Sequence, residues 1–184
     1  MQIQFTIPAV PVAEPRKRSR VVRTGGKSFV SHYTPTTHPV NAFKSSASKS
    51  ATEAIGSLGP LTGPLKIEIV FVLPRTAGQI WKTKPMPRIW HSKKPDFDNL
   101  EKSVCDALKG IVWLDDAQVC CTSVRKVIAA GDESPHVEFA CEQLGRLEAL
   151  VTPNPLGEIG IVWYKTEHTS DGGESQAMRH RTRR

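Results

Sequence analysis

The chain is organised around residues 94–119, which read KPDFDNLEKSVCDALKGIVWLDDAQV. Apolar side chains recur in its middle at helical spacing, which predicts a helix that begins near Asp98 and ends at Lys109 and Gly110. Glu101, three residues after Asp98, is typical of a capping box at a helix start. The apolar stripe of this helix consists of Leu100, Val104, Ala107, Leu108 and Ile111.

Aspartates flank the predicted helix on both sides. The backbone before Pro95 favours extended geometry, so Asp96 and Asp98 should point from one side of a short extended segment. Lys102 lies one helical turn after Asp98 and can reach back over the carboxylates. After the helix, an aspartate pair at 115 and 116 opens another strand-like segment.

These residue types favour a metal-dependent phosphodiester hydrolase. Mg²⁺ prefers oxygen ligands and typically takes one or two carboxylates together with water and phosphate oxygens. A lysine beside such an ion can neutralise charge that develops on a phosphate. Taken singly, each residue has a simpler explanation, because aspartates also cap helices and form turns. Capping, however, requires neither both Asp96 and Asp98 nor the lysine.

The ordered motifs KPDFDNLEK, DAL and WLDDAQV resemble the signature of the RusA family of Holliday junction resolvases, which are common in bacteria and their phages. The resemblance covers roughly residues 1–142. It implies Mg²⁺ ligands at Asp96, Asp98 and Asp116 and a catalytic lysine at Lys102, with Asp115 less critical. It also implies a homodimer that cuts branched DNA, namely four-way junctions, by paired nicks in recombination and repair. Mn²⁺ is a possible substitute for Mg²⁺.

Composition agrees with a nucleic-acid partner. The 184 residues suit one domain with its own core, and the formal net charge of +7 is typical of a protein that binds a polyanion. Six basic residues and no acidic one lie between Arg16 and Lys27, which favours a loop in contact with phosphate, with Gly25 and Gly26 as a flexible tip or hairpin turn.

A second basic loop is expected over residues 74–93. Trp81 and Trp90 are interleaved there with lysines and arginines, among them Arg88, a pattern suited to gripping DNA. Two simpler readings stay open, since charge runs often only solubilise a protein and Trp90 can pack on the body. The DNA-binding candidates from both loops are Arg16, Arg18, Arg20, Lys82, Lys84 and Lys93.

The expected fold class is α/β, and more closely α+β: one small domain with a mixed sheet of four or five strands and two main helices. Strands are predicted near 2–8, 65–73, 118–129 and 136–141, and a further helix near 40–55. The strand at 65–73 becomes continuously apolar and should lie at the centre of the sheet. The strands at 118–129 and 136–141 are predicted to pair as a hairpin.

Beyond this domain of residues 1–142, we expect residues 143–184 to be an extension with one extra strand near 157–164 and a largely disordered basic tail. The cysteines lack zinc-site spacing and are expected to be buried thiols, which suits a reducing compartment. With no apolar run of membrane-spanning length and no secretion signal, we expect a location in bacterial or phage-infected cytoplasm. The cysteines are Cys105, Cys120, Cys121 and Cys141.

Two alternatives remain at this level. The motif fixes the chemistry and not the substrate shape, so a metal-dependent nuclease of other branched DNA or of RNA is possible. A catalytically silent DNA-binding module is the second, although the intact set of aspartates and lysine argues against it.

Overall fold

A computed structural model describes residues 1–81, 83–145, 147–153 and 159–165, the last two ranges as backbone only. The chain divides into two compact units, Met1–Gln143 and Leu144–Arg184. The second unit contains an antiparallel pair of strands, β8 (Leu147–Pro153) and β9 (Ile159–Lys165), where the sequence predicted one strand. Of the expected basic tail, residues 165–184, only Lys165 at the end of β9 is among the described residues.

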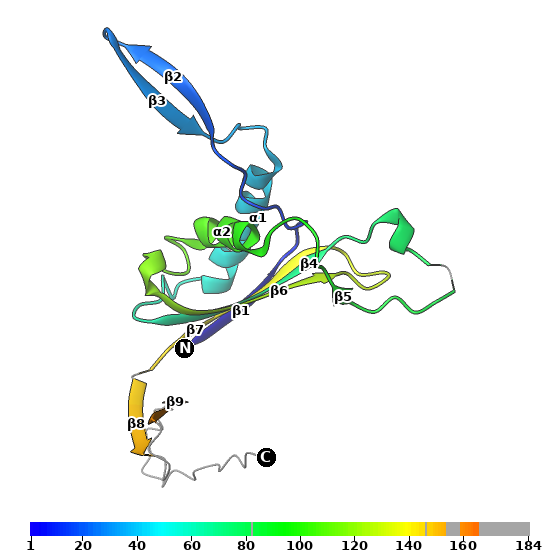
Figure 1. Ribbon diagram of the computed structural model, residues 1–184, viewed down its shortest axis with the longest axis vertical. Helices are drawn as coiled ribbons and strands as arrows, with labels where there is room; N and C mark the ends of the chain where they lie inside the picture. The colour runs from blue at the N-terminus through cyan, green and yellow to red at the C-terminus, as the bar shows by residue number, and fades with distance from the viewer. Residues whose placement is uncertain (82, 146, 154–158, 166–184) are drawn as a thin grey trace. The chain divides into compact units, whose positions relative to one another are not determined.

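The first unit is built on a mixed five-stranded sheet with the order β1-β7-β4-β6-β5 (Figure 1). In this sheet β4 runs parallel to β6, and all other neighbours are antiparallel. Together with two main helices, this arrangement confirms the α+β class and the predicted strand count. The strands are β1 (Gln2–Ile7), β4 (Leu65–Leu73), β5 (Ile89–Trp90), β6 (Val119–Ile128) and β7 (His136–Gln143).

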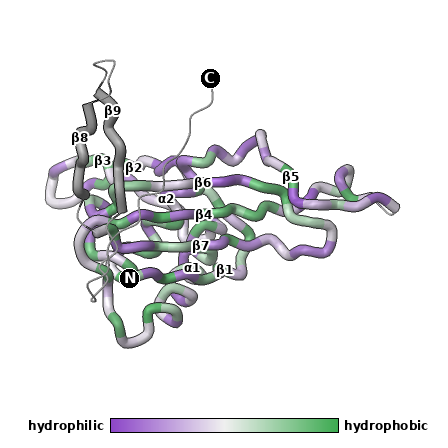
Figure 2. Tube along the Cα trace, turned by 90° about the horizontal axis from the view of Figure 1, so that it is seen from below, coloured by the Kyte–Doolittle hydropathy of each residue, from purple (hydrophilic) through white to green (hydrophobic). Residues whose placement is uncertain are grey.

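The predicted hairpin of β6 and β7 is wrong, because β4 lies between these two strands (Figure 2). The reason is burial: Leu65, Ile67, Ile69 and Phe71 of β4 are completely inaccessible to solvent. A strand this apolar is most stable where both of its edges are paired, which the central position provides.

Both helices lie against one face of the sheet (Figure 1). Helix α1 (Pro39–Ile55) turns Phe43 and the small side chains of Ala47 and Ala51 into the core. Helix α2 (Phe97–Leu108) buries four residues of the predicted stripe, whereas the fifth, Ile111, follows the helix and is half-buried. The fully buried Trp113 closes the core beside the C-terminal end of α2. No helix of the described residues is long and apolar enough to cross a membrane.

Residues 18–33 form a separate antiparallel ribbon, where the sequence predicted a basic loop over residues 16–27. Strands β2 (Arg18–Thr24) and β3 (Lys27–Tyr33) pair with each other and not with the five-stranded sheet. Gly25 and Gly26 connect them with φ of 58° and 76°, the positive values that a two-residue hairpin turn requires. Of the two readings of the glycine pair, a flexible tip or a hairpin turn, the structure therefore confirms the hairpin turn, and β-branched side chains extend the strands on either side of it.

Cys120 and Cys121 are exposed, so the prediction that they are buried is wrong. The register of β6 with β4 shifts between Val119 and Cys121, which leaves Cys120 out of the pairing. Cys121 lies opposite Lys66, whose neighbours in the strand, Leu65 and Ile67, are the ones that face the core. Cys141 is buried, as expected, and Cys105 is half-buried.

Candidate active site

Asp96 and Asp98 lie at the N-terminal end of α2. The helix begins at Phe97, so Asp96 is the cap residue and Asp98 belongs to the first turn, rather than both lying on an extended segment. Glu101 accepts a hydrogen bond from Thr122 Oγ1 of β6 at 2.7 Å, and the predicted capping box with Asp98 does not form. The side chain of Glu101 thus bonds to Thr122 of the neighbouring strand instead of to the backbone at the helix start.

Neither carboxylate is used to build the helix start. Asp96 makes no side-chain cap hydrogen bond, and Asp98 Oδ1 has only a long contact of 3.5 Å with Asn99 Nδ2. Both side chains are exposed, and a carboxylate in the first helical turn is favoured by the helix dipole. The simple capping explanation of Asp96 is therefore not what the structure shows, and both groups are accessible to a ligand.

Lys102 follows Asp98 by one turn on the solvent side of α2 and is exposed. In the part of the chain that the structure describes, no hydrogen bond or ion pair holds its ammonium group. Its side chain can therefore reach a phosphate that approaches the N-terminal end of the helix.

The aspartate pair after α2 has two different roles. Asp115 Oδ1 accepts a hydrogen bond from the Ala117 amide at 3.0 Å, and Gln118 Oε1 accepts from the Asp115 amide at 3.0 Å, so Asp115 caps the short helix η2 (Asp116–Gln118). Asp116 is instead held by Trp113 Nε1 at 2.9 Å and Lys109 Nζ at 3.2 Å. The indole hydrogen bond, with Lys109 adding to it, holds the pKa of Asp116 below its usual range.

One chain does not bring the three predicted metal ligands together. Asp116 contacts Lys109 at the C-terminal end of α2, whereas Asp96 and Asp98 lie at the N-terminal end of the same helix. A helix of 12 residues is roughly 18 Å long. Among the described residues, the only metal-type ligands found as a group of three within 4.8 Å of one another are on Glu133, His136 and Glu138.

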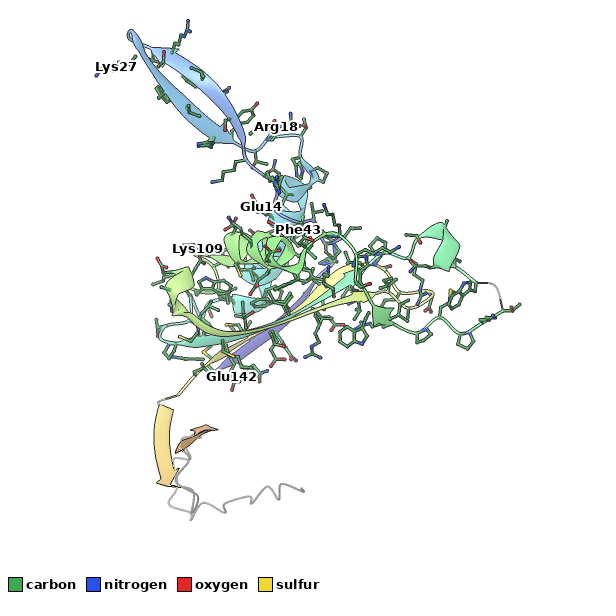
Figure 3. The ribbon with its side chains drawn as sticks, viewed as in Figure 1. Glu14, Arg18, Lys27, Phe43, Lys109 and Glu142 are labelled. Atoms are coloured by element: carbon green, nitrogen blue, oxygen red, sulfur yellow. The ribbon has the colours of Figure 1, made fainter. Side chains whose placement is uncertain are left out.

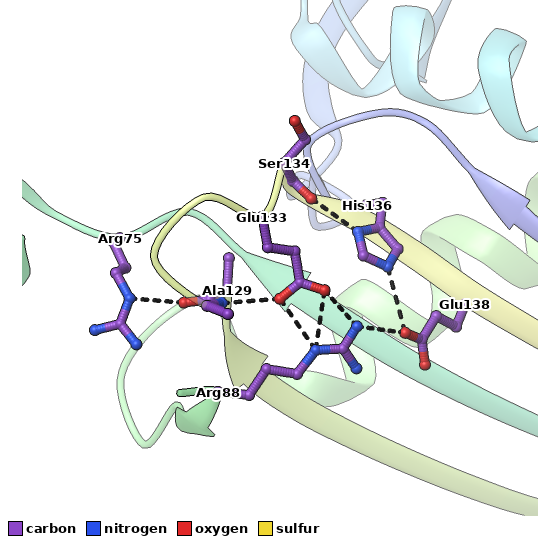
Figure 4. A network of polar contacts seen from close by, with 8 residues as sticks. Arg75, Arg88, Ala129, Glu133, Ser134, His136 and Glu138 are labelled. Carbon is purple, nitrogen blue, oxygen red and sulfur yellow. Dashed lines mark hydrogen bonds and ion pairs between the residues drawn. The ribbon is translucent and has the colours of Figure 1, made fainter. Parts of the chain in front are cut away.

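That acidic cluster is occupied by an arginine (Figure 4). Arg88 Nε lies 3.0 Å from Glu133 Oε1 and its Nη2 lies 2.6 Å from Glu138 Oε1, while His136 Nε2 is 3.3 Å from the same oxygen. The guanidinium lowers the pKa of Glu133 to about 2 and also lowers that of Glu138. The cluster is thus an ion-pair network that fixes the loop before β5, and Arg88 is not free to grip DNA.

The DNA-binding candidates lie on exposed segments. Arg16, Arg18 and Arg20 are exposed on or just before β2, and Lys84 and Lys93 are exposed in the loop before α2. Lys82 lies outside the described residues. Trp90 is 73% exposed, so it does not pack on the body.

Lys126 fixes the approach to α2 through a contact that the sequence did not predict. Lys126 Nζ of β6 donates to the carbonyl oxygens of Lys93 at 2.9 Å and Pro95 at 2.6 Å. These bonds position the segment directly before Asp96. The place of Lys126 in a strand next to Arg125 gave no signal for these two partners.

Exposed carboxylates at a helix start, flanked along the chain by the exposed Lys93, Lys94 and Lys102, define a candidate phosphodiesterase site on an α+β domain. Comparison with known proteins agrees: residues 8–140 match the family Endodeoxyribonuclease RusA, so the chain belongs to this family. The uncharacterized protein YqaN of Bacillus subtilis (strain 168) is 28% identical over 147 residues, which cover 77% of this chain and 96% of that protein. Membership implies a nuclease that acts on Holliday junctions.

Proposed function

We propose that the chain is a Mg²⁺-dependent, structure-specific endodeoxyribonuclease that resolves Holliday junctions by paired nicks in recombination and repair. This proposal rests on the exposed carboxylates of Asp96 and Asp98 in a chain of the RusA family. Neither carboxylate makes a hydrogen bond that caps the start of α2. As for other RusA-like proteins, we place it in the cytoplasm of a bacterial or phage-infected cell.

The side chains fit the metal. Asp96 and Asp98 offer hard oxygen ligands at an exposed helix start, and Mg²⁺ needs only one or two carboxylates when phosphate and water complete its shell. When bound, the ion would polarise the phosphate and lower the pKa of a water. Lys102, one turn away, would hold its ammonium against the negative charge that develops on the scissile phosphate.

A homodimer would supply the third carboxylate. Asp98 and Asp116 mark opposite ends of α2, so two copies related by a twofold axis, with their α2 helices antiparallel, would bring Asp116 of one copy to Asp96 and Asp98 of the other. The exposed side chains of Phe97 and Leu114, next to these carboxylates, supply apolar surface for such a contact. A twofold dimer also presents two identical sites to the two strands that a junction offers.

The domain of residues 1–142 would carry the chemistry, with DNA held by the exposed arginines and lysines named above. Replacing Arg16, Arg18 and Arg20 together with glutamine should lower the slope of log affinity against log salt by about one for each lost phosphate contact. Residues 143–184 would add salt-sensitive affinity at most.

The test is incubation of the full chain with a labelled four-way junction, with and without Mg²⁺ and then Mn²⁺, beside Asp98→Asn. Paired symmetric nicks that require the metal are expected from the wild type. The variant should lose at least about a hundredfold in rate yet bind the junction as tightly or more tightly, because a negative charge beside the phosphates is gone.

Linear duplex, fork and RNA substrates serve as controls for substrate shape. Preferred cleavage of any of these would move the assignment to a different nuclease. Junction binding without nicks under both metals would leave a DNA-binding module.

A further inference from the structure

The two faces of the β2–β3 ribbon differ in chemistry. Directly opposed residues of an antiparallel pair point to the same side, and successive residues alternate. The pairs Ser19↔His32 and Arg20↔Ser31 thus belong to opposite faces. The first, here called the aromatic face, carries Arg18, Arg20, Val22, Thr24, Lys27, Phe29, Ser31 and Tyr33. The second, here called the valine face, carries Ser19, Val21, Arg23, Ser28, Val30 and His32.

Side-chain contacts agree with this division. Arg20 lies over the Tyr33 ring, 5.2 Å from its centroid, on the aromatic face. Ser19 Oγ and His32 Nδ1 are hydrogen-bonded at 2.9 Å on the valine face. The aromatic face therefore already holds a cation against one of its rings.

The aromatic face is both basic and exposed. Arg18 and Lys27 lie at opposite ends of the ribbon (Figure 3), and no acidic residue occurs in the sequence between Glu14 and Glu53. Phe29 is 54% exposed and Tyr33 is 38% exposed. Large apolar side chains at a solvated surface, flanked by cations of one sign, indicate a ligand that is anionic and has apolar faces.

Unpaired nucleotides match this description and duplex DNA does not. A base outside the double helix exposes a flat π-face that stacks on aromatic side chains, with arginines on the adjoining phosphates. In a duplex the base faces cover one another. A protein then reads the bases largely through hydrogen bonds to polar groups at the groove edges, and the Phe29 side chain can neither donate nor accept such bonds. The two rings are four residues apart on β3, about 13 Å, so each can take a separate base.

We propose that the aromatic face binds unpaired nucleotides of branched DNA, with bases stacked on Phe29 and Tyr33 and phosphates paired with Arg18, Arg20 and Lys27. This inference deepens the proposed function and rests on it for the choice of DNA as the polyanion. The ribbon would thereby recognise bases that become unpaired where a branch point opens, separately from the acidic residues of α2.

The test measures binding of the full chain, in chelator, to a labelled single strand and to the matching duplex. Phe29→Leu combined with Tyr33→Leu keeps apolar side chains on the ribbon and removes both rings. We expect this variant to bind the single strand about tenfold more weakly or worse and the duplex within about twofold of the wild type. The matched control, Val21→Ala combined with Val30→Ala, changes the valine face and should leave both affinities within about twofold.

A fluorescent base analogue in the single strand reports stacking directly. Its emission should be quenched by the wild type and by the valine-face variant, and much less by the leucine variant at saturating protein. Equal losses on single strand and duplex, no loss in the leucine variant, or a similar loss in the valine-face control would each overturn the proposal.

Junction cleavage with Mg²⁺, measured in parallel, separates this inference from the proposed function. If the wild-type protein binds single strands through the aromatic face but never nicks a junction, the proposed nuclease function is refuted and the proposed binding face is supported. If the leucine variant shows metal-dependent nicking and an unchanged affinity for single strands, the nuclease function is supported and the proposed binding face is refuted.

Discussion

The indole of Trp113 donates a hydrogen bond of 2.9 Å to Oδ1 of Asp116, from a side chain that is itself fully buried. A core residue thus orients the carboxylate that we propose as the third metal ligand, and lowers its pKa. The neighbouring Asp115 instead serves as a helix cap, and Lys109 Nζ lies 3.8 Å from its Oδ2.

Trp113→Phe should keep an aromatic side chain in the core and remove this bond. We expect metal-dependent cleavage to fall about tenfold, as for other losses of a group that orients a metal ligand. Because the bond depresses the pKa of Asp116, the acid limb of the pH–rate profile should move to higher pH. The measurement is the initial nicking rate against pH.

Phe139→Leu is the matched control for Trp113→Phe. Phe139 is buried, and its ring centroid is 6.2 Å from that of Trp113, so the substitution disturbs the same core without touching Asp116. It should lower stability while leaving the acid limb in place. If the acid limb moves equally in both variants, its position is determined by core packing and not by the hydrogen bond from Trp113.

Mixing two inactive variants should restore nicking if the site is shared between copies. In a mixed dimer of Asp98→Asn and Asp116→Asn chains, one of the two sites receives neither substitution. We therefore expect single nicks from the mixture and almost none from either variant alone. If each chain builds its own site, both sites of the mixed dimer stay defective and the mixture remains inactive.

The Arg88 network should make stability depend on acidic pH. The pKa of Glu133 is lowered to about 2, so its contribution is fully present above the ordinary glutamate pKa and is lost as the pH falls towards 2. Glu133→Gln should cost about 1 kcal/mol near pH 7, a modest value because the network is partly exposed. The difference from the wild type, measured by urea unfolding, should shrink progressively below pH 5.

Arg125→Gln is a suitable comparison, since Arg125 faces Glu68 at 3.6 Å on the surface. It should change stability very little at any pH. A gap between wild type and Glu133→Gln that stays constant down to pH 3 would contradict the assignment.

Thiol reactivity should divide the cysteines into two pairs. Cys120 and Cys121 are exposed, whereas burial raises the pKa of Cys105 to about 12 and that of Cys141 to about 11. Because the thiolate is the reactive form, brief alkylation at mildly basic pH should modify the first pair and spare the second. Intact-mass spectrometry of native and urea-unfolded protein reads this out, and rapid native labelling at Cys105 would contradict it.

Local pattern in the sequence was enough for the two helices and for four strands of the sheet, but not for the β2–β3 ribbon or for β5. The stripe through Leu100, Val104 and Leu108 fixed helix α2, and alternation ending in a continuous apolar run fixed β4 and its central place, because burial periodicity is a property of each segment alone. The glycine pair at 25 and 26 indicated a flexible tip or a hairpin turn, and the structure has the turn. The motif around Asp96 and Asp98 was also sufficient to indicate the family to which the chain belongs.

Contacts between segments that lie far apart in the sequence were determined only by the tertiary structure. The insertion of β4 between β6 and β7, the capture of Glu101 by Thr122, and the pairing of Arg88 with Glu133 and Glu138 each join residues far apart in the chain. No local propensity encodes such partners, because each choice depends on which surfaces meet when the sheet assembles. The same holds for Asp116, which the sequence placed with Asp98 and which the length of α2 keeps away from it within one chain.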